Sequence, residues 1–523
     1  MAEQKYEYLS NLVELRDVLH EPYNDLIHKF ELVDSNSNKN FLFQAFCGIG
    51  KSRVMYKMIF DTHYPLYAFV FPSLGLVEQF VQDYINDTEY GFGIMNEEEY
   101  DVSVICSTKE IKKKKLDIEC TTDKSDISHL LNSRNKKIIC VTYQSYNTLQ
   151  SVLKQKNMKM DLAVFDEAHN SIGDKIHKHI YNNPLYTRGV FFTATPKNNQ
   201  NITMFDRDCQ EESMCGERVA NVTYLDGLFH GHLNDFDIRA GIMKNGDDIM
   251  NTMNIYKTIV RNVLLSKNSR VLTYHTYSNS TKQQNGEMEE DHDEDENEMD
   301  EIETSIHYKT NVKDFVNQKL FKKAFDQVLC ESDFMQYKGM YKKITMKGVV
   351  ANTKNRESIF KQFQHSPDNE IFVISSCQVM KEGIDTKNAN HVVFVDSKNS
   401  ISAIIQNIGR MLRKNDQTIR PATLTIPCLL DYEKYRNMEG ELTQDDYIRT
   451  AIMKFGDFNN IMNVLTAIQQ DDEDYYRMCL VYPNKHFKEE IRRNVESNGL
   501  VFNEDSKTTD ISTLCDIPKM DEE

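Results

Sequence analysis

Eight residues near the start of the chain, Ala45-Phe-Cys-Gly48-Ile49-Gly50-Lys51-Ser52, have the types and spacing of a phosphate-binding loop. They lie between an apolar run at 41–46 and a segment with helical character at 53–60. Glycines let backbone N–H groups point at an anion, and a helix that begins there adds the positive end of its dipole. We expect Lys51 to reach the β- and γ-phosphates of a nucleotide and the Ser52 hydroxyl to ligate Mg²⁺. An ordinary strand-to-helix turn would not require Gly-Lys-Ser.

A pair of acids follows a second apolar run, residues 161–165. Asp166, at the carboxyl end of this expected strand, would hold Mg²⁺ through water, and Glu167 would position and deprotonate an attacking water. Ligands of open α/β sheets bind at this edge. Acids after a strand also cap helices in many folds, but downstream of the loop they indicate hydrolysis of a nucleotide.

Hydroxyl groups end a third apolar run, residues 189–192, in the sequence Thr193-Ala-Thr195-Pro. Such hydroxyls can connect a metal site to a neighbouring domain through hydrogen bonds. A strand that ends in a capped turn would explain the same residues without chemistry.

Three long polar side chains, Gln406, Arg410 and Arg413, recur at spacings of four and three. This spacing predicts that they share one face of a helix. Guanidinium groups on one face suit the charge that develops on a transferred phosphoryl group. A solvated basic helix face is the simpler interpretation of the three residues in isolation.

Short apolar runs that alternate with amphipathic segments must position these groups. Such alternation predicts an α/β protein with parallel, doubly wound sheets. Strands are expected at 68–71, 102–105, 138–141, 162–165 and 189–192, then at 270–274, 348–350, 371–375 and 391–395. The expected organisation is a helical lead at 1–36, a first α/β domain at 37–222, a connector at 223–244, a second α/β domain at 245–430 with an acidic insertion at 280–305, and a mixed, mainly helical C-terminal extension with an acidic tail at 431–523.

The net charge of −18 over 523 residues is concentrated in two segments. Residues 287–303 hold 12 acidic residues and no Lys or Arg, and residues 504–523 have a net charge of −5, which leaves −1 for the remainder. The body of the chain therefore has room for a basic groove, and the acidic insertion or the C-terminal region could recruit a protein partner. The chain has no apolar run that could span a bilayer, its start is charged, and its 11 cysteines form no metal-binding pattern, so we expect a soluble, cytoplasmic protein with reduced thiols.

The ordered motifs resemble those of superfamily 2 helicases and translocases of the DEAH-box type, over residues 20–420. The motifs are A-x-x-G-x-G-K-S at 45–52, D-E-A-H at 166–169, T-A-T-P at 193–196 and Q-x-x-G-R-x-x-R at 406–413. Weaker similarity covers residues 71–79, 141–145, 224–237, 270–275 and 375–385. The style is that of large DNA viruses and bacterial mobile elements, and a viral origin would place the protein in a virus factory or virion.

This resemblance implies two RecA-like domains that bind ATP and Mg²⁺. The ATP site would be formed by two sets of residues. The first domain would contribute Lys51, Ser52, Asp166 and Glu167, and the second would contribute Gly383, Asp385, Gln406, Arg410 and Arg413. Thr193 and Thr195 would couple hydrolysis to movement. Tyr23 would contact adenine, although Asn24 stands where the family has glutamine. The residues implied to line the nucleic-acid groove are Ser73, Gln79, Thr142, Gln144, Ser145, His275 and Thr386.

The leading hypothesis is an ATP-dependent helicase or translocase on DNA or RNA, single-stranded or duplex. An alternative is an ATP-gated switch that binds nucleic acid or a transcription complex without separating strands. A third hypothesis is the motor subunit of a restriction-like complex, which would need a nuclease partner. We expect no membrane partner.

Overall fold

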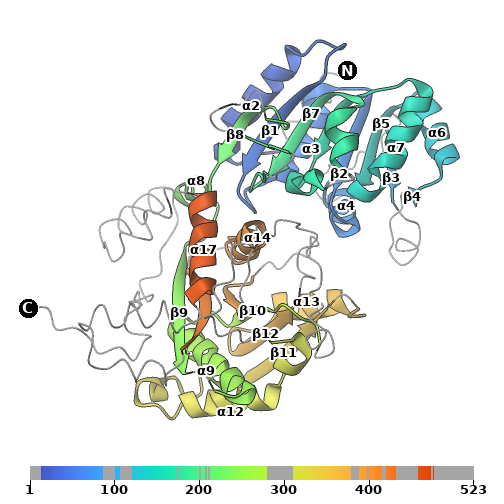
Figure 1. The fold of residues 1–523 in the computed structure, drawn as a ribbon. Coiled ribbons are helices and arrows are strands. Elements are labelled where there is room, and N and C mark those ends of the chain that lie inside the picture. Colours follow the sequence, from blue (N-terminus) through green and yellow to red (C-terminus); the bar gives the residue numbers. More distant parts are fainter. Residues whose placement is uncertain are drawn as a thin grey trace, which may run out of the picture. The chain divides into compact units, whose positions relative to one another are not determined.

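The structure is a computed structural model. It describes residues 13–85, 100–106, 120–173, 176–198, 202–206, 209, 213–244, 246–279, 310–350, 352–377, 388–396, 400–414, 420–430, 458–472 and 475. The chain forms two compact units, the first running to Gly227 and the second starting at Leu228 (Figure 1). The cysteines whose side chains are described carry free thiols. None of the helices in the described part of the chain has the length and apolar character needed to cross a bilayer.

The first unit is an eight-stranded parallel sheet in the order β4-β3-β5-β2-β6-β7-β1-β8, flanked by helices. Its strands are β1 (Lys39–Ala45), β2 (Leu66–Phe71), β3 (Tyr100–Ile105), β4 (Cys120–Thr121), β5 (Lys136–Thr142), β6 (Met160–Phe165), β7 (Tyr186–Thr193) and β8 (Glu217–Val222). Its helices are α2 (Asp17–Glu31), α3 (Lys51–Thr62), α4 (Leu74–Phe80), α6 (Lys124–Asn132) and α7 (Tyr143–Lys156), with short turns η1 (Val81–Ile85), η3 (Ala168–Ile172) and η4 (Lys178–Asn182). The first unit ends within helix α8 (Tyr224–Phe229). Every residue of the central strand β2 is buried, which explains its unbroken apolar sequence.

The second unit is a six-stranded parallel sheet in the order β11-β12-β10-β13-β14-β9. Its strands are β9 (Phe236–Lys244), β10 (Arg270–Tyr274), β11 (Lys343–Val349), β12 (Glu370–Ser376), β13 (His391–Phe394) and β14 (Ala422–Leu430). Its helices are α9 (Asp248–Ser266), α11 (Val312–Phe315), α12 (Gln318–Val328), α13 (Arg356–Gln364), α14 (Ile401–Met411) and α17 (Phe458–Asp471), with the turn η6 (Ser332–Tyr337). Apolar residues of α9 and α12 pack on the sheet to form one core. Helix α17, from the expected C-terminal extension, packs against α14 and β14 (Figure 1).

These two sheets confirm the predicted fold class of two parallel α/β units, and each predicted strand overlaps an observed one. Strands β4 and β8 of the first unit were not predicted, and three strands of the second unit differ from the predictions. Residues 236–244, assigned to a connector, form the edge strand β9 of the second sheet. Strand β11 begins at Lys343, five residues before the expected start. Strand β14 was not predicted, and it contains Pro427.

Candidate active site on the first unit

The phosphate-binding loop lies between β1 and α3, as the sequence predicts. Gly48 has φ 82° and Gly50 has φ 116°, both in the left-handed region that favours glycine. Lys51 is the first residue of α3 and is buried, and its Nζ donates to the carbonyl of Ala45 at 3.0 Å. Ser52, the second residue of α3, is half-buried. The loop thus places an ammonium and a hydroxyl at the N-terminus of a helix, where anions bind.

An arginine that the motif analysis did not single out holds this loop. The Arg16 guanidinium, just before α2, donates from Nη1 to the carbonyl of Gly48 at 2.7 Å. A second hydrogen bond runs in the opposite direction, from Nη1 of Arg53 on α3 to the carbonyl of Glu14 at 3.3 Å. The segment before α2 therefore fixes the backbone of the loop. The only signal in the sequence was a charged residue among the apolar residues that precede the helix.

The acid pair stands at the carboxyl end of β6. Asp166 is buried, and its backbone N–H donates to the carbonyl of Val70 at 2.8 Å. Burial, with a smaller contribution from the neighbouring Glu167 carboxylate, raises the pKa of Asp166 to about 7, while the Lys51 ammonium partly offsets this. Two carboxylates beside one ammonium leave a surplus of negative charge, which a divalent cation would neutralise. The donor set, Asp166 with the Ser52 hydroxyl, suits Mg²⁺, which keeps several waters and binds phosphate oxygens.

Glu167 has an unusual backbone conformation for a residue with a side chain, with φ 45°. Its backbone N–H donates to Oδ1 of Asp166 at 3.0 Å, and its carbonyl accepts from Nδ2 of Asn170 at 3.0 Å. Residues held in such sparsely populated conformations concentrate at functional sites. The side chain of Glu167 is 20% exposed, and water can therefore reach it.

The hydroxyl of Thr193 is connected to this pair through His169. Nδ1 of His169 lies 3.2 Å from Oγ1 of Thr193 and 3.5 Å from Oε2 of Glu167. Oγ1 of Thr193 in turn bonds the carbonyl and the N–H of Thr195, each at 3.2 Å. Thr193 has no exposed surface, whereas Thr195 is half-buried. The structure therefore joins His169, Thr193 and Thr195 by hydrogen bonds and places His169 next to the Glu167 carboxylate.

The motifs meet because adjacent parallel strands end at one edge. In the sheet, Phe71 pairs with Thr142, Val70 with Phe165, Phe165 with Phe191, and Gln44 with Thr193. The order β5-β2-β6-β7-β1 places the ends of these strands side by side. The first unit therefore carries the loop, the acids and the hydroxyls on a single edge, as expected of an open α/β sheet.

Five of the residues implied to line the nucleic-acid groove belong to the first unit and follow strand ends at the same edge. Ser73 caps α4 by accepting from the N–H of Leu76 at 3.4 Å, and Gln79 on that helix is half-buried. Thr142 ends β5 and is buried, Gln144 in the first turn of α7 is exposed, and Ser145 is buried. Gln144 is thus the most accessible member of this set, and a role in strand contact stays a prediction for all of them.

Tyr23 lies in α2 with 3% of its surface exposed. Its hydroxyl donates to Oδ2 of Asp61 on α3 at 2.5 Å, and the Lys57 ammonium lies 5.9 Å from the centre of its ring. These contacts join α2 to α3. In this arrangement the ring is part of the packing between two helices, and the predicted contact with adenine stays a prediction.

The side chain of His275, in the second unit, has no exposed surface. Its Nδ1 lies against the Thr310 hydroxyl, and its Nε2 is 3.0 Å from Oγ1 of Thr273. Asp396 accepts from the N–H groups of Thr276 and Thr310 at 2.6 and 2.9 Å. His275 therefore offers no surface to a strand here, and its observed role is to hold the end of β10. Gly383, Asp385 and Thr386 lie outside the described residues.

Gln406 and Arg410 lie on α14, four residues apart, with Gln406 half-buried and Arg410 buried. The prediction that Arg413 shares their helix face is wrong, because α14 ends at Met411. Arg413 instead forms an isolated bridge with Leu233, and the adjacent Leu412 carbonyl accepts from the N–H of Asn234 at 2.9 Å. Hydrogen bonding to the segment that precedes β9 ends the helix early.

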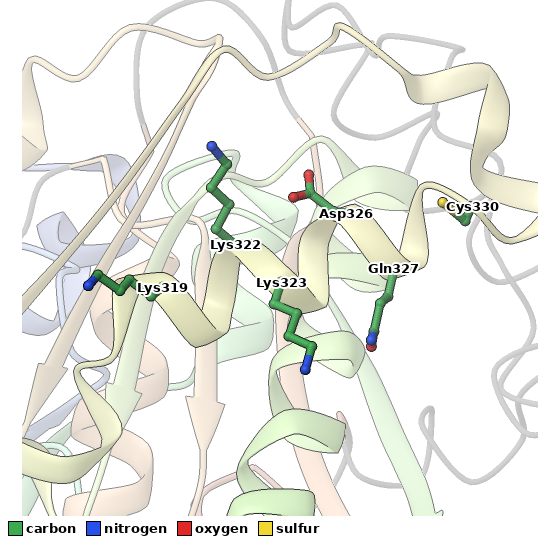
Figure 2. Close-up of a pocket in the computed structure, with 6 residues that line it drawn as sticks. All are labelled: Lys319, Lys322, Lys323, Asp326, Gln327 and Cys330. Atoms are coloured by element: carbon green, nitrogen blue, oxygen red, sulfur yellow. The ribbon is translucent and has the colours of Figure 1, made fainter.

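Helix α12 carries a basic surface that the motif analysis did not detect. Lys319, Lys322 and Lys323 line a hollow of about 470 Å³ together with Asp326, Gln327 and Cys330 (Figure 2). Among the described residues, none of the three ammonium groups has an ion-pair or hydrogen-bond partner. The opposite side of α12, with Phe321 and Phe325, packs into the core. This surface is suited to a polyanion.

Comparison with known proteins supports the assignment of both units. The family profile described as "Type III restriction enzyme, res subunit" matches residues 12–198, and the "Helicase conserved C-terminal domain" profile matches residues 300–415. The chain belongs to the superfamily 2 helicases. This superfamily 2 protein is 22% identical over 401 residues to "Probable helicase A859L" of African swine fever virus, isolate Tick/South Africa/Pretoriuskop Pr4/1996. The match covers 75% of the chain and 39% of that relative.

Two solved structures share the fold. One is described as the ATP-dependent Type ISP restriction-modification enzyme LlaBIII bound to DNA, with a TM-score of 0.59, 17% identity, and coverage of 88% of this chain and 30% of that one. The other is a nuclease-deletion mutant of the Type ISP enzyme LlaGI in complex with a DNA substrate mimic, with a TM-score of 0.55, 16% identity, and coverage of 92% and 31%. The superfamily 2 chain spans about a third of these two proteins. The likeness confirms the tandem arrangement of two helicase-type α/β domains.

Proposed function

We propose that the chain is an ATP-dependent motor that moves along nucleic acid, with duplex DNA as its track. The observation that carries this proposal is the pair formed by the buried Asp166 and the half-buried Glu167, at the same sheet edge as the Lys51 loop, with Lys51 close enough to influence the pKa of Asp166. Such a site binds a nucleotide through its phosphates and supplies both a cation ligand and a base for water. A site of this D-E-A-H type hydrolyses ATP with Mg²⁺.

In the proposed reaction, the loop and Lys51 would bind the β- and γ-phosphates, while Ser52 and Asp166 would hold a Mg²⁺ ion, which supplies positive charge to neutralise these phosphates. Glu167 accepts the proton of the attacking water. Gln406, Arg410 and Arg413 would stabilise the charge on the transferred phosphoryl group, the role that the family resemblance gives them. Thr193 and Thr195 would couple hydrolysis to movement on nucleic acid, because Thr193 is hydrogen-bonded both to His169 and to Thr195.

DNA is favoured over RNA because both structural relatives are described in complex with DNA or its mimic. We favour translocation over strand separation because one of the two matched profiles and both structures are described as restriction enzymes. The same observation favours the third hypothesis, in which the chain serves as the motor of a larger assembly. The ATP-gated switch remains the alternative of a different class.

Steady-state ATP hydrolysis tests the proposal, with the protein alone and with single-stranded DNA, duplex DNA, single-stranded RNA or duplex RNA. Lys51→Ala is the blank. We expect duplex DNA to stimulate turnover at least tenfold, and displacement of a DNA triplex strand to show movement. Equal turnover with every polymer would overturn the proposal in favour of a switch that a protein partner controls. Stimulation by RNA alone would overturn the choice of track.

A further inference from the structure

One hydrogen bond connects the expected strand-contacting segment to the acid pair. The hydroxyl of Tyr143, the first residue of α7, donates to the backbone carbonyl of Asp166 at 3.0 Å. The tyrosine is buried, with its ring 6.4 Å from that of Phe165 at a shallow angle. Burial, together with the nearby Asp166 carboxylate, raises the pKa of the Tyr143 hydroxyl well above its usual value, so the hydroxyl remains a donor at any working pH.

This bond crosses an intervening strand. Tyr143 follows β5 and Asp166 follows β6, and β2 lies between them in the sheet. Strands two positions apart are separated by roughly 9.5 Å, so backbone atoms of β5 and β6 cannot bond each other directly. The long tyrosine side chain therefore provides a direct polar link between the two strand ends.

The accepting carbonyl belongs to the peptide group that joins Asp166 to Glu167. Because a peptide group is planar, its carbonyl and its N–H move together. Tyr143 holds the carbonyl end, and the Asp166 carboxylate accepts from the N–H end at 3.0 Å. Hydrogen bonds thus fix both the carbonyl and the N–H of the peptide group that precedes Glu167. The strained φ of 45° at Glu167 is measured relative to this peptide group. The hydroxyl of Tyr143 therefore helps to aim the Glu167 carboxylate.

On its other side, Tyr143 is flanked by residues implied to contact nucleic acid. Thr142 precedes it, and Gln144 and Ser145 follow in the first turn of α7. A nucleic-acid strand that bound at this turn would shift the first residues of α7. The Tyr143 phenol would transmit this shift to the peptide group that joins Asp166 to Glu167. The route is separate from the one through His169 and Thr193, since no hydrogen bond joins Tyr143 to either residue in the described part of the chain.

We propose that Tyr143 is a positioning residue that transmits nucleic-acid binding at the start of α7 to the Asp166–Glu167 pair, through its hydrogen bond to the Asp166 carbonyl. This inference rests on the proposed function, since it requires a polymer that stimulates hydrolysis. It assigns the phenol a role in the response to the polymer, while ATP binding and polymer binding depend on other groups.

Tyr143→Phe tests the inference, because it removes the hydroxyl and keeps the ring against Phe165. Tyr146→Phe is the matched control, since it removes a buried hydroxyl from the same helix and its ring also packs on Phe165, at 5.6 Å. Three quantities are measured for each protein: ATP turnover without polymer, ATP turnover at saturating duplex DNA, and the Kd for that DNA without ATP. Thermal unfolding shows whether the variants are folded.

For Tyr143→Phe we expect the Kd to stay within twofold of the wild type, and the stimulated kcat to fall at least fivefold more than turnover without polymer. Tyr146→Phe should keep full stimulation. Unchanged stimulation in Tyr143→Phe would overturn the inference, as would an equal loss of basal and stimulated turnover, which indicates a structural role alone. A wild-type chain that no DNA or RNA stimulates would overturn the proposed function as well, and the wild-type data alone would reveal it.

Discussion

Nδ1 of His169 lies 3.2 Å from the hydroxyl of Thr193, on the neighbouring strand β7, while remaining within 3.5 Å of the Glu167 carboxylate. Both the histidine and the threonine are buried. A polar contact in such a setting is strengthened by the low local dielectric and is costly to leave unmade. The contact therefore provides a testable route from the acid pair to Thr195.

Replacing His169 or replacing Thr193 should impair the same process, the stimulation of ATP hydrolysis by DNA. We expect His169→Ala and Thr193→Ala each to lower DNA-stimulated turnover about tenfold, and the double variant to be little worse than either single one, because the residues act through one contact. A double-mutant cycle on the stimulated kcat measures this coupling, expected at roughly 0.5–3 kcal/mol. Additive losses would show that the two side chains act independently.

Glu167→Gln should separate ATP binding from turnover. The amide keeps the size of the side chain but cannot accept the proton of water, so we expect kcat to fall by at least about a hundredfold, in line with the loss of a general base. Binding of a fluorescent ATP analogue should change less than threefold. Glu31→Gln, which alters a carboxylate that is 73% exposed, is the control and should change neither quantity. Near-normal turnover in Glu167→Gln would show that Glu167 is not the general base for the attacking water.

The raised pKa of Asp166 predicts a pH-dependent stability. Between the ordinary carboxyl pKa near 3.8 and the folded-state value of about 7, the folded chain binds the extra proton, so rising pH disfavours folding across this window. The contribution is at most about 1.4 kcal/mol per pH unit. Metal-free wild type should therefore lose more unfolding free energy than Asp166→Asn between pH 5 and pH 7. Denaturant unfolding at these two pH values measures the difference, and parallel curves would contradict the prediction.

The strands and the motifs of the first unit could be predicted because buried parallel strands are apolar throughout, and because chemistry at a strand end needs particular residue types. Strand β9 was missed because Asp237 and Arg239 interrupt its apolar pattern, although Arg239 is buried. Strand β14 was missed because Pro427 argues against a central strand. The proline is tolerated because β13 pairs with β14 only up to Thr425. The early end of α14 depends on hydrogen bonds to a segment more than 170 residues away, which helical spacing cannot reveal.

Arg16 should contribute to nucleotide affinity although it lies outside the motifs. Its charge-assisted hydrogen bond to the Gly48 carbonyl, of a type worth roughly 1.5–3 kcal/mol, holds the loop in the shape that presents its N–H groups. We expect Arg16→Ala to raise the KM for ATP about tenfold or more and to change kcat less. Arg53→Ala removes a longer bond to the Glu14 carbonyl and should have the smaller effect. Equal KM values for wild type and Arg16→Ala would refute this role.

The lysines of α12 should contribute to salt-dependent binding of DNA. Lys322 and Lys323 project to opposite sides of the helix, and Lys319 lies one turn earlier, so the three can span a sugar-phosphate backbone (Figure 2). Each phosphate contact adds about 0.9 to the slope of log K against log salt. Replacing all three by Gln should lower this slope by roughly 2 to 3, with basal ATP turnover unchanged. The control is a second triple variant that removes equal charge from exposed positions of the same unit. It combines Lys338→Gln, Lys354→Gln and Lys361→Gln. Equal slopes for the two triple variants would show that α12 acts only through net charge.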